Sequence, residues 1–115
     1  MSNVIDDLKK FIKESETSFT SSKWLSDDKM QVYIRKGHHL IDGKMKTCLD
    51  IANVTVYKKS RGTFTAFLKE AHELNPWCAT FAECIQEPRL INFFLLNGWT
   101  PVNNFESFYL IKNGT

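Results

Sequence analysis

Val54 to Leu68, VTVYKKSRGTFTAFL, is the stretch that decides the fold, because one kind of periodicity gives way to another within it. Its two valines alternate with polar residues as in a half-buried strand, whereas Phe64, Phe67 and Leu68 recur at the spacing of a helix over 63–74. A strand that passes through a short basic loop into a helix is typical of a sheet covered by helices. The stretch therefore predicts an α/β or α+β fold.

The basic loop has the composition of an anion site. The first N–H groups of a helix point outward, and the helix dipole adds positive potential there. Gly62 would let the backbone approach a ligand closely, and Lys58, Lys59 and Arg61 supply positive charge. A solvated turn has the same composition. The pattern alone therefore predicts either a phosphate site at 61–65 or an ordinary exposed loop.

Upstream of the loop, the hydrophobic alternation changes phase. Leu49 and Ile51 share one parity of a strand predicted over 45–57, and Val54 and Val56 share the other. Because side chains in a strand alternate strictly between faces, the two pairs cannot share one face of a regular strand. The pattern predicts either that two strands meet between Ile51 and Val54 or that one strand carries a β-bulge there.

Other elements flank this segment on both sides. Apolar spacing, alternation and turn residues predict a helix over 3–14, a polar loop over 15–29 anchored by Phe19 and Trp24, a strand over 30–35, a hairpin turn over 38–43, a buried strand over 78–85, a helix between Pro88 and Gly98 and a last strand over 107–112. The 115 residues suffice for one domain, 1–115, with its core in 30–112.

Composition excludes several classes of protein. With 15 Lys and Arg against 13 Asp and Glu, the net charge of +2 is too small to favour a nucleic-acid partner. No apolar run approaches the roughly 20 residues of a membrane span, and the early acidic residues are unlike a secretory signal. The three cysteines lack CxxC spacing, so no metal site is predicted, and their odd number fits a reducing cytoplasm.

Two motifs, in this order, resemble the GNAT superfamily of acyl-CoA-dependent N-acyltransferases. The family's pyrophosphate loop commonly has the pattern Arg/Gln-x-x-Gly-x-Gly/Ala, and residues 59–64 here are KSRGTF. Its next motif is a strand and then a helix that ends in Phe-Tyr-x-x-x-Gly-Phe, and residues 93–99 here are FFLLNGW. The tail FYL, 108–110, lies where the family has its last strand. The match covers 30–112 and looks most like the short GNAT-type proteins of phages and bacteria.

The resemblance implies a reduced GNAT-like fold, with a mixed, mostly antiparallel twisted sheet and helices on both faces. Acetyl-CoA would lie in a V-shaped split between the strand that ends near Val56 and the strand 78–84, and the bulge would meet its thioester. The cofactor-binding residues so implied are Val54, Val56, Lys59, Arg61, Gly62, Thr63, Phe64, Thr65 and Phe94. Two of them depart from the family: Phe64 stands where Gly or Ala is usual, and Phe94 where many members have the Tyr that protonates the CoA thiolate.

Glu83 is the residue predicted to do acid–base chemistry. A carboxylate within a buried strand must face a cleft or be paired with a cation. At the mouth of the split, Glu83 would be the general base that deprotonates an acceptor amine. The alternative is a structural ion pair with Arg89 or with a lysine.

Several other polar residues are expected to be structural. His38 and His39 fall in the predicted turn and are expected to be solvated. Asp50, beside the predicted bulge, is expected to pair with Arg35 across two strands. Cys84 is expected to be a small buried side chain without a nucleophilic role.

The sequence thus supports an N-acetyltransferase that moves an acetyl group from acetyl-CoA to an amine, with a protein among the acceptors. The alternative is an inactive GNAT-like module that binds or inhibits a host protein, because a fold does not fix a function and Phe64 and Phe94 weaken the case for an enzyme. The short region 1–29 would leave the acceptor site open to a partner or to the second subunit of a homodimer. The expected location is the cytoplasm of a bacterium, or of a host if the gene is carried by a phage.

Overall fold

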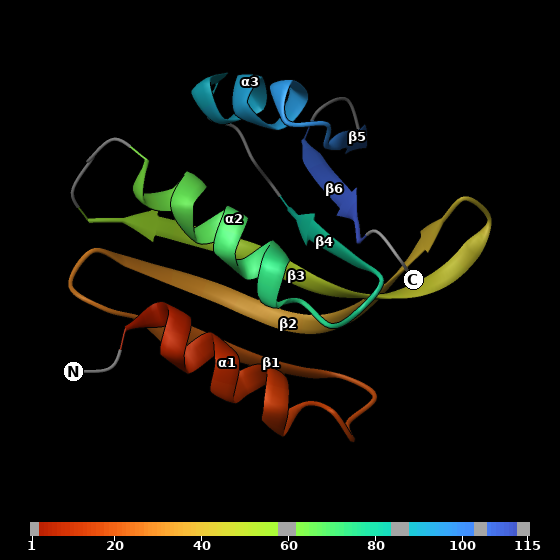
Figure 1. Ribbon diagram of the computed structural model, residues 1–115, viewed down its shortest axis with the longest axis horizontal. Coiled ribbons are helices and arrows are strands. Elements are labelled where there is room, and N and C mark those ends of the chain that lie inside the picture. Colours follow the sequence, from red (N-terminus) through yellow and green to blue (C-terminus); the bar gives the residue numbers. More distant parts are fainter. Residues whose placement is uncertain (1–2, 58–61, 84–87, 103–105, 113–115) are drawn as a thin grey trace.

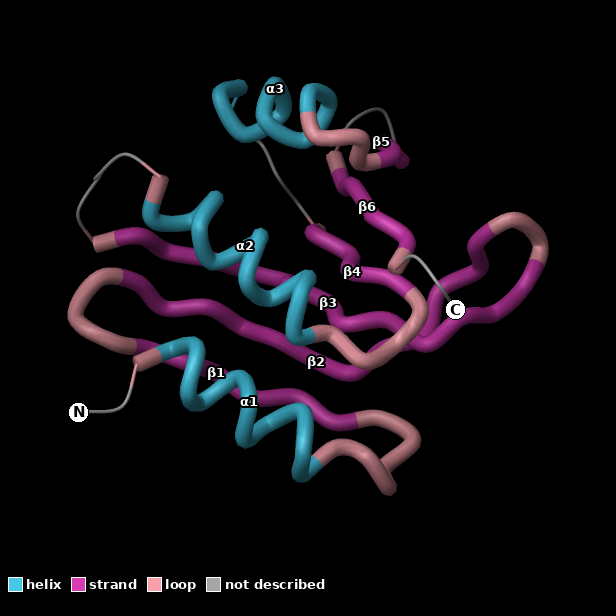
Figure 2. Tube along the Cα trace, viewed as in Figure 1, coloured by secondary structure: helices cyan, strands magenta, loops and turns pink. Residues whose placement is uncertain are grey.

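The computed structural model describes residues 3–57, 62–83, 88–102 and 106–112 (Figure 1). Its elements are α1 (Val4–Glu14), β1 (Ser21–Ser26), β2 (Met30–Ile41), β3 (Lys44–Val56), α2 (Thr63–Leu74), β4 (Ala79–Ala82), α3 (Pro88–Leu96), β5 (Thr100–Val102) and β6 (Ser107–Ile111). The strands form one six-stranded sheet in the order β1-β2-β3-β4-β6-β5 (Figure 2). Neighbouring strands are antiparallel except β3 and β4. The predicted α+β fold with a mixed, mostly antiparallel sheet is confirmed.

The first helix forms because its apolar residues lie on one stripe and its start is capped. Val4, Leu8 and Phe11 are buried, and the Asn3 side chain accepts a hydrogen bond from the Asp6 N–H at 2.9 Å. The lysines of α1 are exposed on the other side. None of the described helices is long and apolar enough to cross a membrane.

The turn between β1 and β2 is held by Asp27. One carboxylate oxygen accepts hydrogen bonds from the Lys29 and Met30 N–H groups at 2.8 and 3.0 Å, and the other accepts the Val4 N–H at 3.4 Å. The turn is thereby tied to the start of α1. Burial opposes ionisation of this carboxyl, but the three backbone hydrogen bonds outweigh it and lower the pKa of Asp27.

We expect Asp27→Ala to lower the free energy of unfolding by about 1–2 kcal/mol at pH 7, because backbone donors lose their acceptor. The folded pKa lies below the unfolded value of 3.8, so this stabilisation is present above the unfolded pKa and is lost as the pH falls through the folded one. Urea unfolding followed by tryptophan fluorescence should show the difference from wild type narrowing below about pH 4. Asp28→Ala, at the exposed neighbour, is the control, and equal losses in both variants would refute the role of Asp27.

The β2–β3 hairpin turns at Asp42 and Gly43, whose φ angles are 53° and 79°, as a tight two-residue hairpin turn requires. The predicted Asp-Gly turn is therefore confirmed. Pairing of the two strands continues up to this turn, so β2 runs to Ile41. The prediction that His38 and His39 lie in the turn is wrong, because both are paired strand residues.

The predicted β-bulge is confirmed. The register of β2 against β3 shifts between Tyr33 and Ile34 and skips Ala52 on the opposite strand. The extra residue turns Ile51 and Val54 to the same face of the sheet, although they are three positions apart in the sequence. The change of phase in the sequence therefore marks one bulged strand rather than two strands.

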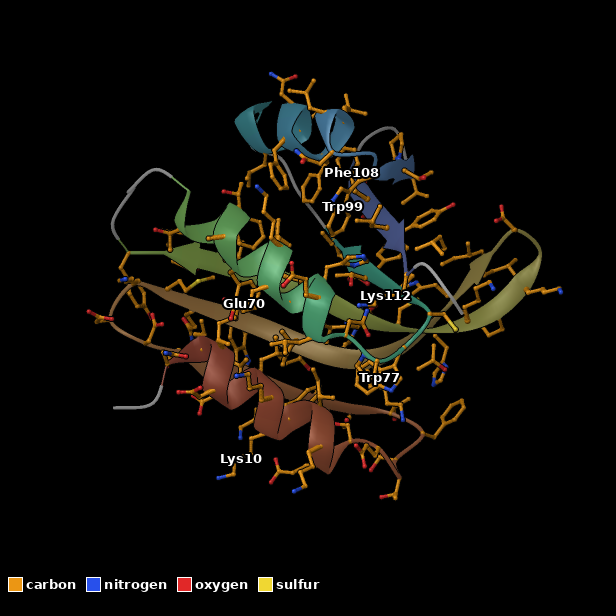
Figure 3. All side chains as sticks on the ribbon, viewed as in Figure 1. Lys10, Glu70, Trp77, Trp99, Phe108 and Lys112 are labelled. Carbon is orange, nitrogen blue, oxygen red and sulfur yellow. The ribbon has the colours of Figure 1, made fainter. Side chains whose placement is uncertain are left out.

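The main core lies between one face of the sheet and the helices (Figure 3). All three helices contribute to it, through Val4, Leu8, Phe11, Phe64, Phe67, Leu68, Ala71 and Phe94. In α3, the ring of Phe94 stacks on Phe108 of β6, with centroids 4.6 Å apart. The opposite face carries a smaller cluster of Ile41, Cys48, Ala79 and Phe81, and no described helix residue belongs to it. The described helices thus cover one face of the sheet, whereas helices on both faces were expected.

Two strands were not expected. β1 lies within the predicted loop 15–29 and pairs with β2 from Ser21 to Ser26. Only Leu25 of this strand is buried, so its sequence has little alternation to reveal it. Phe19 and Trp24, expected to anchor a loop, are 77% and 51% exposed. The short β5 is likewise formed by pairing with β6. The helices over 63–74 and from Pro88, and the remaining strands, are confirmed.

Candidate functional site

The two parallel strands at the centre of the sheet are paired along only part of their length. Their register ends where Ile51 pairs with Ala82, and the last hydrogen bond runs from the Glu83 N–H to the Ile51 carbonyl at 3.0 Å. Beyond the bulge, β3 continues to Val56, whereas β4 ends at Ala82 (Figure 1). Among the described residues, this last part of β3 has a strand partner on the β2 side only.

The open edge of β3 presents backbone groups. In an antiparallel pair, successive residues turn their N–H and C=O groups alternately toward and away from the partner strand. The Tyr57 N–H reaches the Lys29 carbonyl of the neighbouring strand segment at 2.8 Å. By this alternation, Val54 and Val56 point their N–H and C=O groups away from β2, toward the side of β3 on which β4 lies. Both residues were predicted to contact a cofactor; their side chains pack against the main core, so any such contact would be made by their backbone groups.

The edge leads to the start of α2. Gly62 is the N-cap residue, with φ 81°, and as a glycine it has no side chain with which to cap the helix. Its carbonyl accepts the Ala66 N–H at 2.8 Å. Phe64 is 5% exposed and belongs to the main core, so its ring turns inward. An aromatic residue at this position is therefore compatible with an accessible helix start.

The remaining residues predicted for a cofactor divide into three groups. Thr63 and Thr65 are half-buried in the first turn of α2, and the Thr65 hydroxyl donates to the Gly62 carbonyl at 3.2 Å. Lys59 and Arg61, the predicted source of positive charge, lie outside the described residues, as does Cys84. Phe94 is fully buried between Phe108 and Trp99.

Four polar side chains form a network where the pairing of β3 with β4 ends. We call this network the polar cluster, and it consists of Arg35 and His39 of β2, Asp50 of β3 and Glu83 after β4. The Arg35 guanidinium donates to Asp50 Oδ2 at 3.0 Å from Nε and to Glu83 Oε1 at 2.5 Å from Nη2. His39 Nε2 lies 2.8 Å from Asp50 Oδ1 and 3.8 Å from Glu83 Oε1. The expected cross-strand pair of Arg35 and Asp50 is confirmed, and Glu83 is ion-paired with Arg35.

One side chain of the polar cluster is buried, and the other three are partly exposed to solvent. Asp50 is 1% exposed, whereas the side chains of Arg35, His39 and Glu83 are 38%, 23% and 19% exposed. A Cβ atom at Gly37 would overlap the Asp50 carboxylate. Glycine at this position therefore leaves the space through which Asp50 reaches His39 on the next pleat of β2.

Two pKa shifts follow from this arrangement. Although burial disfavours its charged form, hydrogen bonds to Asp50 and Glu83 raise the pKa of Arg35, so the guanidinium stays charged. Burial, and then the charge of Asp50, raise the pKa of the Cys48 thiol to about 12. Cys48 is therefore a neutral thiol near pH 7 and no nucleophile.

A pocket of about 340 Å³ adjoins the polar cluster. Arg35, His39 and Asp50 form one wall, and Tyr33 and the segment 20–22 before and within β1 form another. An incoming molecule can thus reach the polar cluster across β1 and β2. Sequence reasoning missed His39, because a histidine beside a glycine and before an Asp-Gly pair is typical of a turn.

No family model, curated protein or solved structure matches this chain.

Proposed function

We propose that the protein is an acyl-CoA-dependent N-acyltransferase. The observation that carries the proposal is the part of β3 after the bulge, which among the described residues pairs with β2 only and leads toward the N-terminus of α2. An extended amide-containing chain, such as the pantetheine arm, can pair with such an edge as an added strand does. The helix start supplies outward N–H groups and positive potential for a pyrophosphate. Gly62, Thr63 and Thr65 would meet the phosphates, and Val54 and Val56 the arm.

The proposed reaction places the thioester beside the bulge, next to the polar cluster. The amine nitrogen of the acceptor forms a bond to the thioester carbonyl carbon, the carbon–sulfur bond breaks, and CoA leaves as its thiolate. The amine proton passes to a base in the polar cluster, where Glu83 was predicted for that role. Holding the two reactants in place supplies much of the rate. This activity would belong to the cytoplasm, with an amine of a small molecule or of a protein as acceptor.

A second candidate function is an acyl-CoA-binding or protein-binding module without turnover. It is favoured by Phe94, which stands at the position of the acid in the resembling family. Its ring has no proton to donate and is fully buried against Phe108. In this case the protein would bind the cofactor, or a protein partner on the helix-free face, and release no CoA.

Calorimetric titration with acetyl-CoA tests the proposal. We expect saturable binding in the micromolar range, with ADP, which has the pyrophosphate but no pantetheine arm, binding more weakly because the β3 edge stays unpaired. Absence of binding at millimolar acetyl-CoA would remove both the enzyme and the acyl-CoA-binding module. Release of free thiol with a panel of amino acids, polyamines and lysine peptides then separates the enzyme from the module.

A further inference from the structure

His39 is held more rigidly than a solvated histidine. Its Nε2 lies 2.8 Å from Asp50 Oδ1, and its ring stacks on Phe81 with centroids 4.0 Å apart and planes 7° apart. Asp50 is itself held by Arg35 on its other oxygen. The imidazole thus has one orientation, set by a buried carboxylate on one side and an aromatic ring below.

This orientation determines which nitrogen can take a proton. An ionised carboxylate is only an acceptor, so Nε2 carries the hydrogen that bonds to Asp50. In the neutral imidazole, Nδ1 then has the free lone pair. Within the described residues, Nδ1 of His39 has no hydrogen-bond partner. An imidazole can act as a base when one nitrogen donates its hydrogen to a carboxylate and the other nitrogen has a free lone pair.

Glu83 is the competing base, and its surroundings are less suited to that role. Its Oε1 accepts the Arg35 Nη2 hydrogen bond at 2.5 Å. A carboxylate paired with a guanidinium must give up the attraction between the two charges when it takes a proton. His39 gives up no such attraction, and the proton that it gains is stabilised by Asp50 and by Glu83 at 3.8 Å.

His39 lines the pocket beside the polar cluster, and its two carboxylate neighbours lie where the pairing of β3 with β4 ends. The Glu83 N–H donates the backbone hydrogen bond that marks this end of strand pairing. Among the described residues, the charged or titratable groups around it are Asp50, Arg35, Glu83, the cross-strand neighbour Lys46 and the neutral thiol of Cys48. Within the polar cluster, two carboxylates face one guanidinium, which suits a cationic amine as the entering group.

We infer that His39, oriented by Asp50, is the proton acceptor of the acyl transfer, an inference that rests on the proposed function. The acceptor first loses its ammonium proton to water and attacks the thioester carbonyl carbon as the neutral amine. A second proton of the same nitrogen then passes to His39 Nδ1, the carbon–sulfur bond breaks, and CoA leaves as the thiolate. The resulting imidazolium is paired with Asp50 through Nε2. Asp50 acts as a positioning residue. The absence of a side chain at Gly37 leaves room for the Asp50 carboxylate.

The test is ¹⁵N NMR of the histidine side chains, which reports the tautomer of each imidazole without any acceptor or cofactor. The chain has three histidines, so His39 is assigned with His38→Gln and His72→Gln. In the neutral form of His39 we expect the hydrogen on Nε2. In Asp50→Asn, whose side-chain amide can donate to Nε2, we expect the hydrogen to move to Nδ1, which removes the base while a structural contact is kept.

Glu83→Gln is the matched control, and it should leave the hydrogen of His39 on Nε2. A wild-type His39 whose neutral form carries its hydrogen on Nδ1 would overturn the inference. So would an Asp50→Asn variant with an unchanged tautomer. Because the titration with acetyl-CoA is a separate measurement, its failure would overturn the proposed function, whereas the tautomers test the orientation of the base alone.

Discussion

Gly62→Glu is expected to weaken acetyl-CoA binding by about 100-fold, or ~2.7 kcal/mol. Gly62 is the N-cap of α2 with φ 81°, where any side chain is strained and would stand at the helix start. A carboxylate there would occupy the N–H groups and repel the pyrophosphate that they are proposed to bind. Calorimetry with acetyl-CoA measures the loss.

The chain offers a matched control at Gly43. This residue also has a positive φ, 79°, and open space around its Cα, but it lies in the β2–β3 turn. Gly43→Glu therefore introduces the same strain and the same charge at the other end of β3. Gly62→Ala separates strain from charge at the site itself. Unchanged affinity in Gly62→Glu, or an equal loss in Gly43→Glu, would place the cofactor elsewhere.

Asp50→Ala is expected to lower the free energy of unfolding by about 2–3 kcal/mol, because Arg35 and His39 lose a buried, charged hydrogen-bond partner. Asp50 is 1% exposed and holds Arg35 and His39 at once. Glu83→Ala removes a carboxylate from the same network at a more exposed position, and its cost should stay within about 1 kcal/mol. Equilibrium denaturation in urea at pH 7 compares the two variants.

Gly37→Ala tests the same buried carboxylate with every charge retained. Its new Cβ atom would overlap the Asp50 carboxylate, so Asp50 must move away from Arg35 and His39. We expect destabilisation in the same direction as for Asp50→Ala and loss of the fixed tautomer of His39. Equal stabilities of Asp50→Ala and Glu83→Ala would show that the polar cluster is not organised around the buried acid.

Periodicity predicted the elements whose own residues alternate between core and solvent. Helix α2 follows from the spacing of Phe64, Phe67 and Leu68, which pack in the core as expected. The bulge follows from the change of phase after Ile51, because each side of it has an apolar parity of its own. In both cases the residues that carry the signal also make the contacts.

Strand pairing between distant segments formed elements and contacts that periodicity could not predict. β1 buries only Leu25, and it is a strand because β2 lies beside it. His39 has the local sequence of a turn, but the hairpin continues to Ile41 and places it beside Asp50 of the next strand. Glu83 was singled out from its own segment, yet its partner Arg35 is 48 residues away.

The order of hydrophobic and polar residues along the chain determined the helices, the bulge and the basic approach to α2, since these depend on neighbours within a few positions. Only the tertiary structure decided that the described helices share one face of the sheet, and that Arg35, His39, Asp50 and Glu83 meet on the other. The reason is that strand order and register bring together residues far apart in sequence, and no local pattern records which strands will be neighbours.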